Sequence, residues 1–177
     1  MSSFLIEGGH SLSGDIYPQG AKNEALQILC ATLLTPERVV INNIPDILDI
    51  RNLIHLLREM GVKVERLSDE SYAFQADNVS IDYTYSEEYA QKASSLRGSV
   101  LMLGPMLGRF GKAVLPQVGG DKIGRRRLDT HMVGFKALGA EFNHNIGRHT
   151  CEITASKLTG KYMLLDEASV TDRKSVV

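Results

Sequence analysis

The sequence lacks tryptophan and has few aromatic residues of any kind, since Phe, Trp and Tyr together make up 6% of its 177 residues. Proteins that bind single-stranded nucleic acid commonly stack bases on aromatic side chains, so this mode of binding has no support here. The sequence also has no large excess of positive or negative charge, because it contains 20 Lys and Arg and 21 Asp and Glu, which gives a formal net charge of −1. We therefore expect no general attraction to nucleic acid or to a membrane surface, and any anion site must be local.

Cysteine is scarce, and long hydrophobic runs are absent. Cys30 and Cys151 lie far apart, with no CxxC and no His at metal-ligand spacing, so we expect reduced core thiols in a cytoplasmic protein. The most apolar segment, residues 100–107, contains Gly104 and Pro105 and is too short to span a bilayer. The first ten residues have no basic region followed by an apolar stretch, so we expect no signal peptide.

What the sequence does have is an internal repeat. The first copy predicts an apolar helix, an extended segment, a second helix that ends at Gly61, and a strand pair, over residues 24–34, 38–42, 50–60, 62–67 and 72–76. The second copy predicts the same order, with Gly139 as the helix stop, over residues 98–107, 112–116, 129–138, 140–144 and 150–154. We therefore expect an α/β (α+β) domain built from repeated βαβαββ units.

The two copies differ in length at one place. Val40 corresponds to Val114, an offset of 74 residues, whereas Gly61 corresponds to Gly139, an offset of 78. About four residues have therefore been added within residues 117–127, between the strand and the second helix of copy two. Packing of the repeat does not need such a loop, which makes it the candidate functional segment.

The loop and the helix start after it read VGGDKIGRRRLDTH, residues 118–131. Gly119 and Gly120 allow a ligand to approach the backbone closely. The three arginines of residues 125–127 precede a helix N-terminus, and both features attract phosphate. The alternative interpretation is a solvated run of charges on an edge loop.

Two further cations occupy helix starts. Lys22 lies at the start of the first helix of copy one, where a positive charge opposes the helix dipole and suggests a nearby anion. The alternative is an exposed lysine followed by Asn23 as the helix N-cap. Arg97 begins the corresponding helix of copy two; taken alone, this position favours a surface residue over a ligand contact.

The motifs AKNEALQ (residues 21–27), Arg97-Gly-Ser and GGDKIGRRRLDTH together resemble the UDP-N-acetylglucosamine 1-carboxyvinyltransferases of the enolpyruvyl transferase family. The resemblance covers nearly all of residues 1–171. The related shikimate-phosphate enolpyruvyl transferases usually have Ser-Lys-Ser where this chain has Lys22 followed by Asn23.

The resemblance implies a fold and a domain division. The fold is an inside-out α/β barrel with two domains of βαβαββ units, of which this chain holds two units and the start of a third. Residues 1–21 are expected to form strands of the other, mostly missing domain, and residues 22–171 the truncated repeat domain. Residues 172–177 (DRKSVV) match the translation of a common sequencing adapter, so we expect a non-native tail.

The resemblance also implies an activity: transfer of the enolpyruvyl group from phosphoenolpyruvate to the 3-hydroxyl of UDP-N-acetylglucosamine, releasing phosphate. This is the first committed step of peptidoglycan synthesis. No metal or organic cofactor is implied. The partners are the two small-molecule substrates and the missing C-terminal half of the same chain, which supplies the carboxylate base. We therefore expect the 177 residues alone to be inactive.

Site residues follow from the same resemblance. Those expected to bind phosphoenolpyruvate are Lys22, Asn23 and Arg126. Those expected to bind UDP-N-acetylglucosamine are Arg97, Arg126, Arg127, Leu128, Asp129, Thr130, Ser169 and Val170. Asp121 stands where most members have the cysteine that acts as general acid, so Asp121 is the expected catalytic residue, in an enzyme insensitive to fosfomycin. The family usually has Arg-Pro where this chain has Arg126-Arg127.

Three alternatives stay open at this level. The chain could belong to a shikimate-phosphate-type enolpyruvyl transferase, to a stand-alone module that binds a nucleotide sugar or polyphosphate through the arginine loop, or to a structural repeat protein whose arginines are solvated surface.

Overall fold

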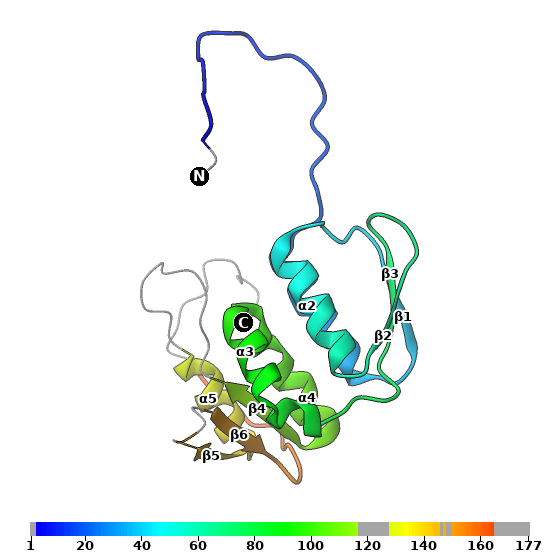
Figure 1. Ribbon diagram of the computed structural model, residues 1–177. Coiled ribbons are helices and arrows are strands. Elements are labelled where there is room, and N and C mark those ends of the chain that lie inside the picture. Colours follow the sequence, from blue (N-terminus) through cyan, green and yellow to red (C-terminus); the bar gives the residue numbers. More distant parts are fainter. Residues whose placement is uncertain (1–2, 117–127, 146, 148–149, 165–177) are drawn as a thin grey trace.

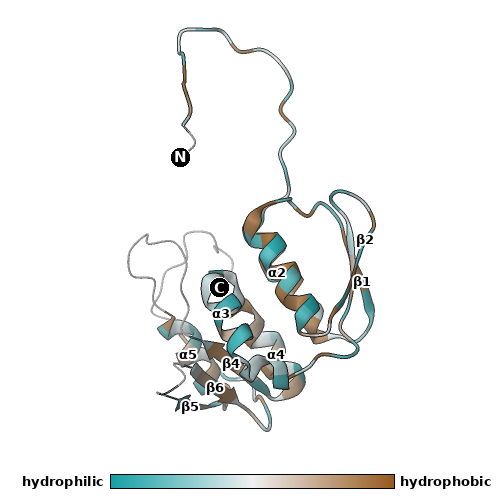
Figure 2. Cartoon of the chain, viewed as in Figure 1, coloured by the Kyte–Doolittle hydropathy of each residue, from teal (hydrophilic) through white to brown (hydrophobic). Residues whose placement is uncertain are grey.

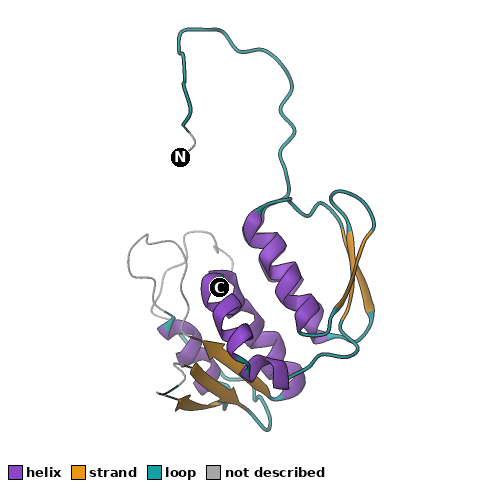
Figure 3. Cartoon of the chain, in the orientation of Figure 1, coloured by secondary structure: helices purple, strands orange, loops and turns teal. Residues whose placement is uncertain are grey.

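The computed structural model describes residues 3–116, 128–145, 147 and 150–164. Two separate three-stranded sheets lie on either side of a group of helices (Figure 1). Most of the helices lie between the two sheets, as the colouring by secondary structure shows (Figure 3). None of the described helices is both long and apolar enough to cross a membrane.

The first sheet belongs to copy one of the repeat. Its unit contains α1 (Lys22–Ala31), η1 (Thr32–Leu34), β1 (Arg38–Ile41), α2 (Leu48–Glu59), β2 (Lys63–Arg66) and β3 (Tyr72–Gln75). The strand order is β1-β3-β2, with β3 antiparallel to both neighbours. Val39, Phe74 and Val64 lie in register across the sheet. Because Phe74 is fully buried, this row marks the face that packs toward the helices.

The second sheet repeats this topology. Its unit contains η3 (Arg97–Met102), α4 (Leu103–Phe110), β4 (Lys112–Pro116), α5 (Asp129–Ala137), β5 (Glu141–Asn145) and β6 (Thr150–Thr154), with strand order β4-β6-β5. Gly61 and Gly139 both have left-handed backbone angles, with φ of 98° and 103°. The predicted repeat, its strand pairs and its two glycine helix stops are confirmed.

The two units share one hydrophobic core. The buried side chains of α2 gather along one side of the helix, and Figure 2 shows this contrast between a hydrophobic and a hydrophilic side. They pack in the same cluster as residues of unit two such as Leu107 and Ile153. Met60, Met102 and Met106 are buried as predicted. Cys30 and Cys151 are buried free thiols, also as predicted.

One arginine ties the units together through the backbone. Arg109 of α4 donates from Nη1 to the carbonyl oxygen of Leu33 at 2.9 Å and to that of Ala76 at 2.8 Å. Both carbonyls belong to unit one, at its first helix and at the end of its hairpin. The guanidinium also lies 4.8 Å over the ring of Phe110.

The connection between the units contains two elements that sequence analysis missed, η2 (Asp82–Tyr85) and α3 (Glu87–Ser95). The sequence did carry a signal for α3. Ser86 is its N-cap and accepts a hydrogen bond from the Tyr89 N–H at 3.1 Å, and Glu87 and Glu88 occupy the first turn. A capping serine followed by two acidic residues is a typical helix start.

Glu59, at the end of α2, anchors this connection. Its carboxylate accepts a hydrogen bond from the Tyr83 hydroxyl at 2.9 Å, pairs with Lys92 of α3, and lies 3.1 Å from His55 Nε2. The hydrogen bond from Lys92 holds the pKa of Glu59 below its ordinary value. Burial, together with the hydrogen bond to Glu59, raises the pKa of Tyr83 to about 12. The Glu59 carboxylate therefore joins α2, η2 and α3.

We expect Glu59→Gln to lower the free energy of unfolding of this chain at neutral pH by about 1–2 kcal/mol, because a charged acceptor of several hydrogen bonds is lost. Glu59 stabilises the fold above its ordinary pKa of 4.5, and this contribution is lost as the pH falls through its lower folded-state pKa. Urea unfolding from pH 7 to pH 3 should therefore show a smaller acid-induced loss in the variant than in the wild type. Glu65→Gln, at an exposed pair with Arg38, is the control and should change stability little. Equal losses in both variants would contradict the anchoring role.

Residues 3–21 contain no helix or strand and expose large apolar side chains. Phe4, Leu12 and Ile16 are each more than 90% exposed. The assignment of residues 1–21 to another domain stays a prediction, as does the foreign origin of residues 172–177, which lie outside the described part of the chain.

Candidate active site

Lys22 is the first residue of α1, and its charge is balanced by a residue that sequence analysis did not single out. The Lys22 ammonium lies 2.5 Å from Oδ2 of Asp49, the second residue of α2. Both side chains are nearly half exposed. A cation at this end of a helix opposes the dipole, and the Asp49 carboxylate supplies the expected nearby anion. Solvent can reach both groups, so a second anion can approach Lys22.

The chain just before Lys22 is held against the loop between β1 and α2. A side chain at Gly20 would place its Cβ 1.9 Å from the carbonyl oxygen of Asn43, so no other residue fits there without movement. Asn43 itself has a left-handed backbone, with φ of 58°, a conformation that Asn tolerates better than most residues. This close crossing places the start of α1 beside the start of α2, and therefore Lys22 beside Asp49.

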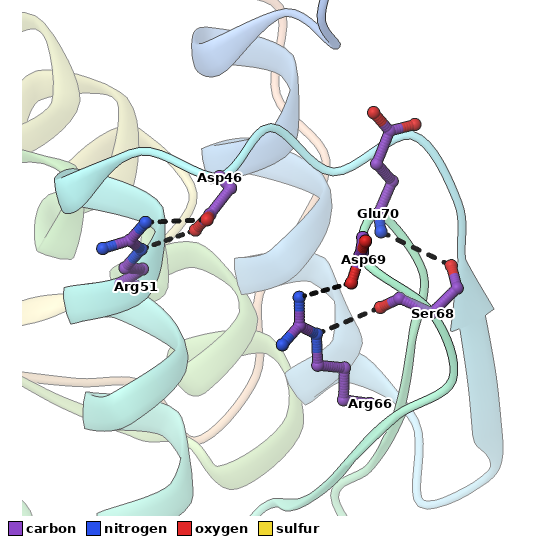
Figure 4. A network of polar contacts seen from close by, with 6 residues as sticks. All are labelled: Asp46, Arg51, Arg66, Ser68, Asp69 and Glu70. Carbon is purple, nitrogen blue, oxygen red and sulfur yellow. Dashed lines mark hydrogen bonds and ion pairs between the residues drawn. The ribbon is translucent and has the colours of Figure 1, made fainter.

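The start of α2 is fixed by a paired contact (Figure 4). Arg51 donates from Nε and Nη2 to the two carboxylate oxygens of Asp46, at 2.5 and 2.7 Å. These hydrogen bonds hold the pKa of Asp46 below its ordinary value. Close by, Arg66 of the hairpin donates to the carbonyl oxygen of Ser68 and to Asp69. Because Asp46 and Arg51 flank residue 49 in the sequence, their pairing fixes the segment that carries Asp49.

Asn23 follows Lys22 within the first turn of α1 and is exposed. The N-cap is Ala21, which makes no side-chain capping bond. The alternative in which Asn23 caps this helix is therefore wrong. Within the part of the chain that is described, the Asn23 amide makes no hydrogen bond, so it is available to a ligand.

Arg97 occupies the matching place in unit two, as the first residue of η3. A Cβ on the next residue, Gly98, would lie 3.1 Å from Cδ2 of Leu26 in α1, so the backbone at Gly98 lies against the Leu26 side chain. Leu26 is one helical turn after Lys22. The half-buried Arg97 makes no hydrogen bond or ion pair with any described residue. The start of α2 thus lies beside Lys22 through Asp49, and the start of η3 packs against α1 one helical turn after Lys22.

The remaining predicted site residues divide into two groups. Leu128 is the N-cap of α5, and Asp129 and Thr130 form its first turn, where an acidic residue suits the helix dipole. Asp121, Arg126, Arg127, Ser169 and Val170 lie outside the described residues. Among the residues that are described, no three His, Cys, Asp or Glu side chains gather as a metal site would require.

Comparison with known proteins gives consistent matches. The sequence model of the EPSP synthase (3-phosphoshikimate 1-carboxyvinyltransferase) family matches residues 6–174. UDP-N-acetylglucosamine 1-carboxyvinyltransferases from Bacteroides thetaiotaomicron and Porphyromonas gingivalis are 60% and 59% identical to the chain over 177 residues. These alignments include all of this chain but only 41% of each relative, so the chain spans well under half of their length.

Solved structures show the same fold. The enolpyruvyl transferase NikO from Streptomyces tendae superposes with a TM-score of 0.69 at 23% identity, over 86% of this chain and 32% of that one. EPSP synthase from Acinetobacter baumannii gives a TM-score of 0.61 at 17% identity, over 89% of this chain and 35% of that one. Both similarities concern the fold alone. With the family model matched over residues 6–174, this chain belongs to the EPSP synthase family of enolpyruvyl transferases.

Proposed function

We propose that the 177 residues are the N-terminal part of a UDP-N-acetylglucosamine 1-carboxyvinyltransferase. The observation that carries the proposal is 60% identity, along the whole chain, to proteins of that name. This similarity favours the UDP-sugar reaction over the shikimate-phosphate alternative. The complete protein then acts in the cytoplasm, on phosphoenolpyruvate and UDP-N-acetylglucosamine, in the first committed step of peptidoglycan synthesis.

The reaction requires charge stabilisation and proton transfer. A proton adds to the methylene carbon of phosphoenolpyruvate while the sugar 3-hydroxyl oxygen bonds to the neighbouring carbon. The hydroxyl proton passes to a base, which the family resemblance places beyond this chain. Phosphate then leaves as a proton is removed from the resulting methyl group, which restores the double bond. Both substrates are anionic, and the intermediate retains their charge, so the site needs fixed cations.

The described residues fit the binding part of this scheme. Lys22 already contacts a carboxylate oxygen of Asp49 and is accessible to solvent, which suits binding of the carboxylate or phosphate of phosphoenolpyruvate. Asn23 offers an amide beside it, and Arg97 offers a guanidinium from the neighbouring unit that no residue of the described ranges pairs with. Arg126, Arg127, residues 128–130, Ser169 and Val170 are proposed to complete the sugar-nucleotide site, and Asp121 to donate the proton.

The proposal extends to the domain arrangement. In an inside-out barrel of such units, the helices lie inside and the sheets outside. The two units of this chain, with helices between their sheets, are consistent with part of such a barrel. The exposed apolar side chains of residues 3–21 are suited to pair with a second domain, and burial of each would stabilise that contact by roughly 1.5–3 kcal/mol.

The test is a phosphate-release assay. The complete protein should release phosphate from phosphoenolpyruvate when UDP-N-acetylglucosamine is present and not when shikimate 3-phosphate replaces it. The 177-residue chain alone should show no turnover above background, because the base and one side of the cleft are missing. Turnover with shikimate 3-phosphate would overturn the proposed substrate, and robust turnover by the isolated chain would overturn the two-domain scheme.

A further inference from the structure

The backbone turns a sharp corner immediately before Arg97. The helix α3 ends at Ser95, and η3 begins at Arg97. Leu96 between them is extended, with φ of −115° and ψ of 105°, and is only 3% exposed. Arg97 is therefore the first residue past a buried corner, and the direction in which its side chain leaves depends on how firmly that corner is held.

The hydroxyl of Ser99 closes this corner. Ser99 Oγ donates to the carbonyl oxygen of Ala93 at 2.8 Å, and the Ser99 N–H donates to the carbonyl oxygen of Leu96 at 3.0 Å. The Leu96 N–H also donates to the Ala93 carbonyl, at 3.2 Å. Carbonyls in the last turn of a helix lack partners within the regular helix. The Ser99 hydroxyl, which is only 3% exposed, is a hydrogen-bond donor for the Ala93 carbonyl in this turn. These bonds join residues on both sides of Arg97.

The surroundings of the corner are also fixed. Gly98 lies against Leu26 of α1, and Lys92 of α3 pairs with Glu59 of α2. Thus α3 is anchored before the corner and η3 is packed after it. By contrast, no described residue forms a hydrogen bond or ion pair with the Arg97 side chain.

We propose that Ser99 is a positioning residue for Arg97. By tying the first turn of η3 to the last turn of α3, its hydroxyl fixes the backbone from which the guanidinium reaches the anionic sugar nucleotide. An arginine on a fixed backbone loses less freedom when it binds, so the hydroxyl contributes to affinity without touching the ligand. This inference rests on the proposed function, in which Arg97 binds UDP-N-acetylglucosamine.

The experiment is a double-mutant cycle in the complete enzyme. We expect Ser99→Ala to raise KM for UDP-N-acetylglucosamine by about threefold to tenfold, with kcat and KM for phosphoenolpyruvate changed less than about twofold. In an Arg97→Ala background the same change should add less than about twofold, because the residue through which Ser99 acts is gone. Ser95→Ala is the matched control: it removes a hydroxyl-to-carbonyl bond of 2.7 Å, to Lys92, at the same helix end. Its KM should equal that of the wild type.

The outcomes distinguish a failure of the proposed role of Arg97 from a failure of the positioning role of Ser99. If Arg97→Ala leaves KM for the UDP-sugar unchanged, the assignment of Arg97 in the proposed function is wrong. If Arg97→Ala raises KM but Ser99→Ala does not, or raises it equally in both backgrounds, positioning by Ser99 is overturned and the proposed function stands. Should Ser99→Ala fail to accumulate as folded protein, Ser99→Cys, which replaces the hydroxyl with a somewhat larger thiol that is only a weak donor, is put through the same cycle with the same expected result.

Discussion

Replacing Asp121 with asparagine in the complete enzyme is expected to lower kcat by a factor of about 10²–10⁴, the usual contribution of a positioned acid. Asparagine has the shape of aspartate but has no acidic proton to donate to the methylene carbon of phosphoenolpyruvate. Asp121→Cys should retain turnover, because a thiol can donate a proton and most UDP-N-acetylglucosamine 1-carboxyvinyltransferases are expected to have cysteine at this position. Phosphate release under saturating substrates is the measurement, and an active asparagine variant would exclude the acid role.

The pH dependence of this enzyme follows from the same assignment. An ordinary aspartate has a pKa of about 3.9, and the cations next to Asp121 in the sequence, Lys122 and Arg125–Arg127, favour its ionised form. Bound phosphoenolpyruvate and diphosphate bring negative charge, which favours the protonated form. Protonation of Asp121 should therefore be coupled to substrate binding, and kcat should fall as the pH rises. The Cys variant should retain activity to higher pH, since an ordinary thiol has a pKa of about 8.5.

Fosfomycin provides an independent readout. The compound acts on UDP-N-acetylglucosamine 1-carboxyvinyltransferases by alkylating the loop thiol, and a carboxylate is a much weaker nucleophile than a thiolate. The wild-type enzyme should stay active after prolonged incubation, whereas Asp121→Cys should be inactivated with time. Strong time-dependent inactivation of the wild type would contradict the predicted insensitivity to fosfomycin.

Replacing Lys22 with alanine in the complete enzyme should lower kcat/KM for phosphoenolpyruvate by about ten- to a hundredfold, which corresponds to loss of one charge-assisted contact of roughly 1.5–3 kcal/mol. Steady-state kinetics with phosphoenolpyruvate varied is the measurement. Lys63→Ala is the control, because Lys63 forms a similar exposed pair, 2.6 Å from Asp77, on the first sheet.

The alternative for Lys22 is that it serves only as the ion-pair partner of Asp49. In that case Lys22→Ala and Asp49→Ala would change thermal stability slightly and equally, and kcat/KM for phosphoenolpyruvate would not depend on the charge at position 22. That result would remove Lys22 from the substrate site.

Much of the fold was predictable because its signals are local. The helix stops at Gly61 and Gly139 and the alternating strands of each hairpin depend on neighbouring residues, and repetition gave each signal twice. The placement of α3 was not predicted, although its Ser86 cap and acidic first turn were present. Its nine residues carry only two buried side chains, Tyr89 and Ala93, so the apolar periodicity is weak.

The site was predictable only in part, for a related reason. Lys22 and Arg97 were singled out as candidates because each begins a helix at the same place in its repeat. Asp49 and Ser99 were missed, because their importance depends on contacts that the sequence does not display. Asp49 approaches Lys22 where the chain at Gly20 crosses Asn43, and the proposed role of Ser99 depends on the turn of the chain at Leu96.

The two hydrogen bonds from Arg109 to Leu33 and Ala76 bear on how the units unfold. A repeat whose neighbours meet only through side chains can fray one unit at a time. Here a side chain of unit two satisfies main-chain acceptors of unit one, so opening either unit leaves polar groups of the other without partners. The amides around these carbonyls and those of α4 should therefore exchange hydrogen with solvent in one cooperative opening event, with a shared free energy, although they lie in different copies of the repeat.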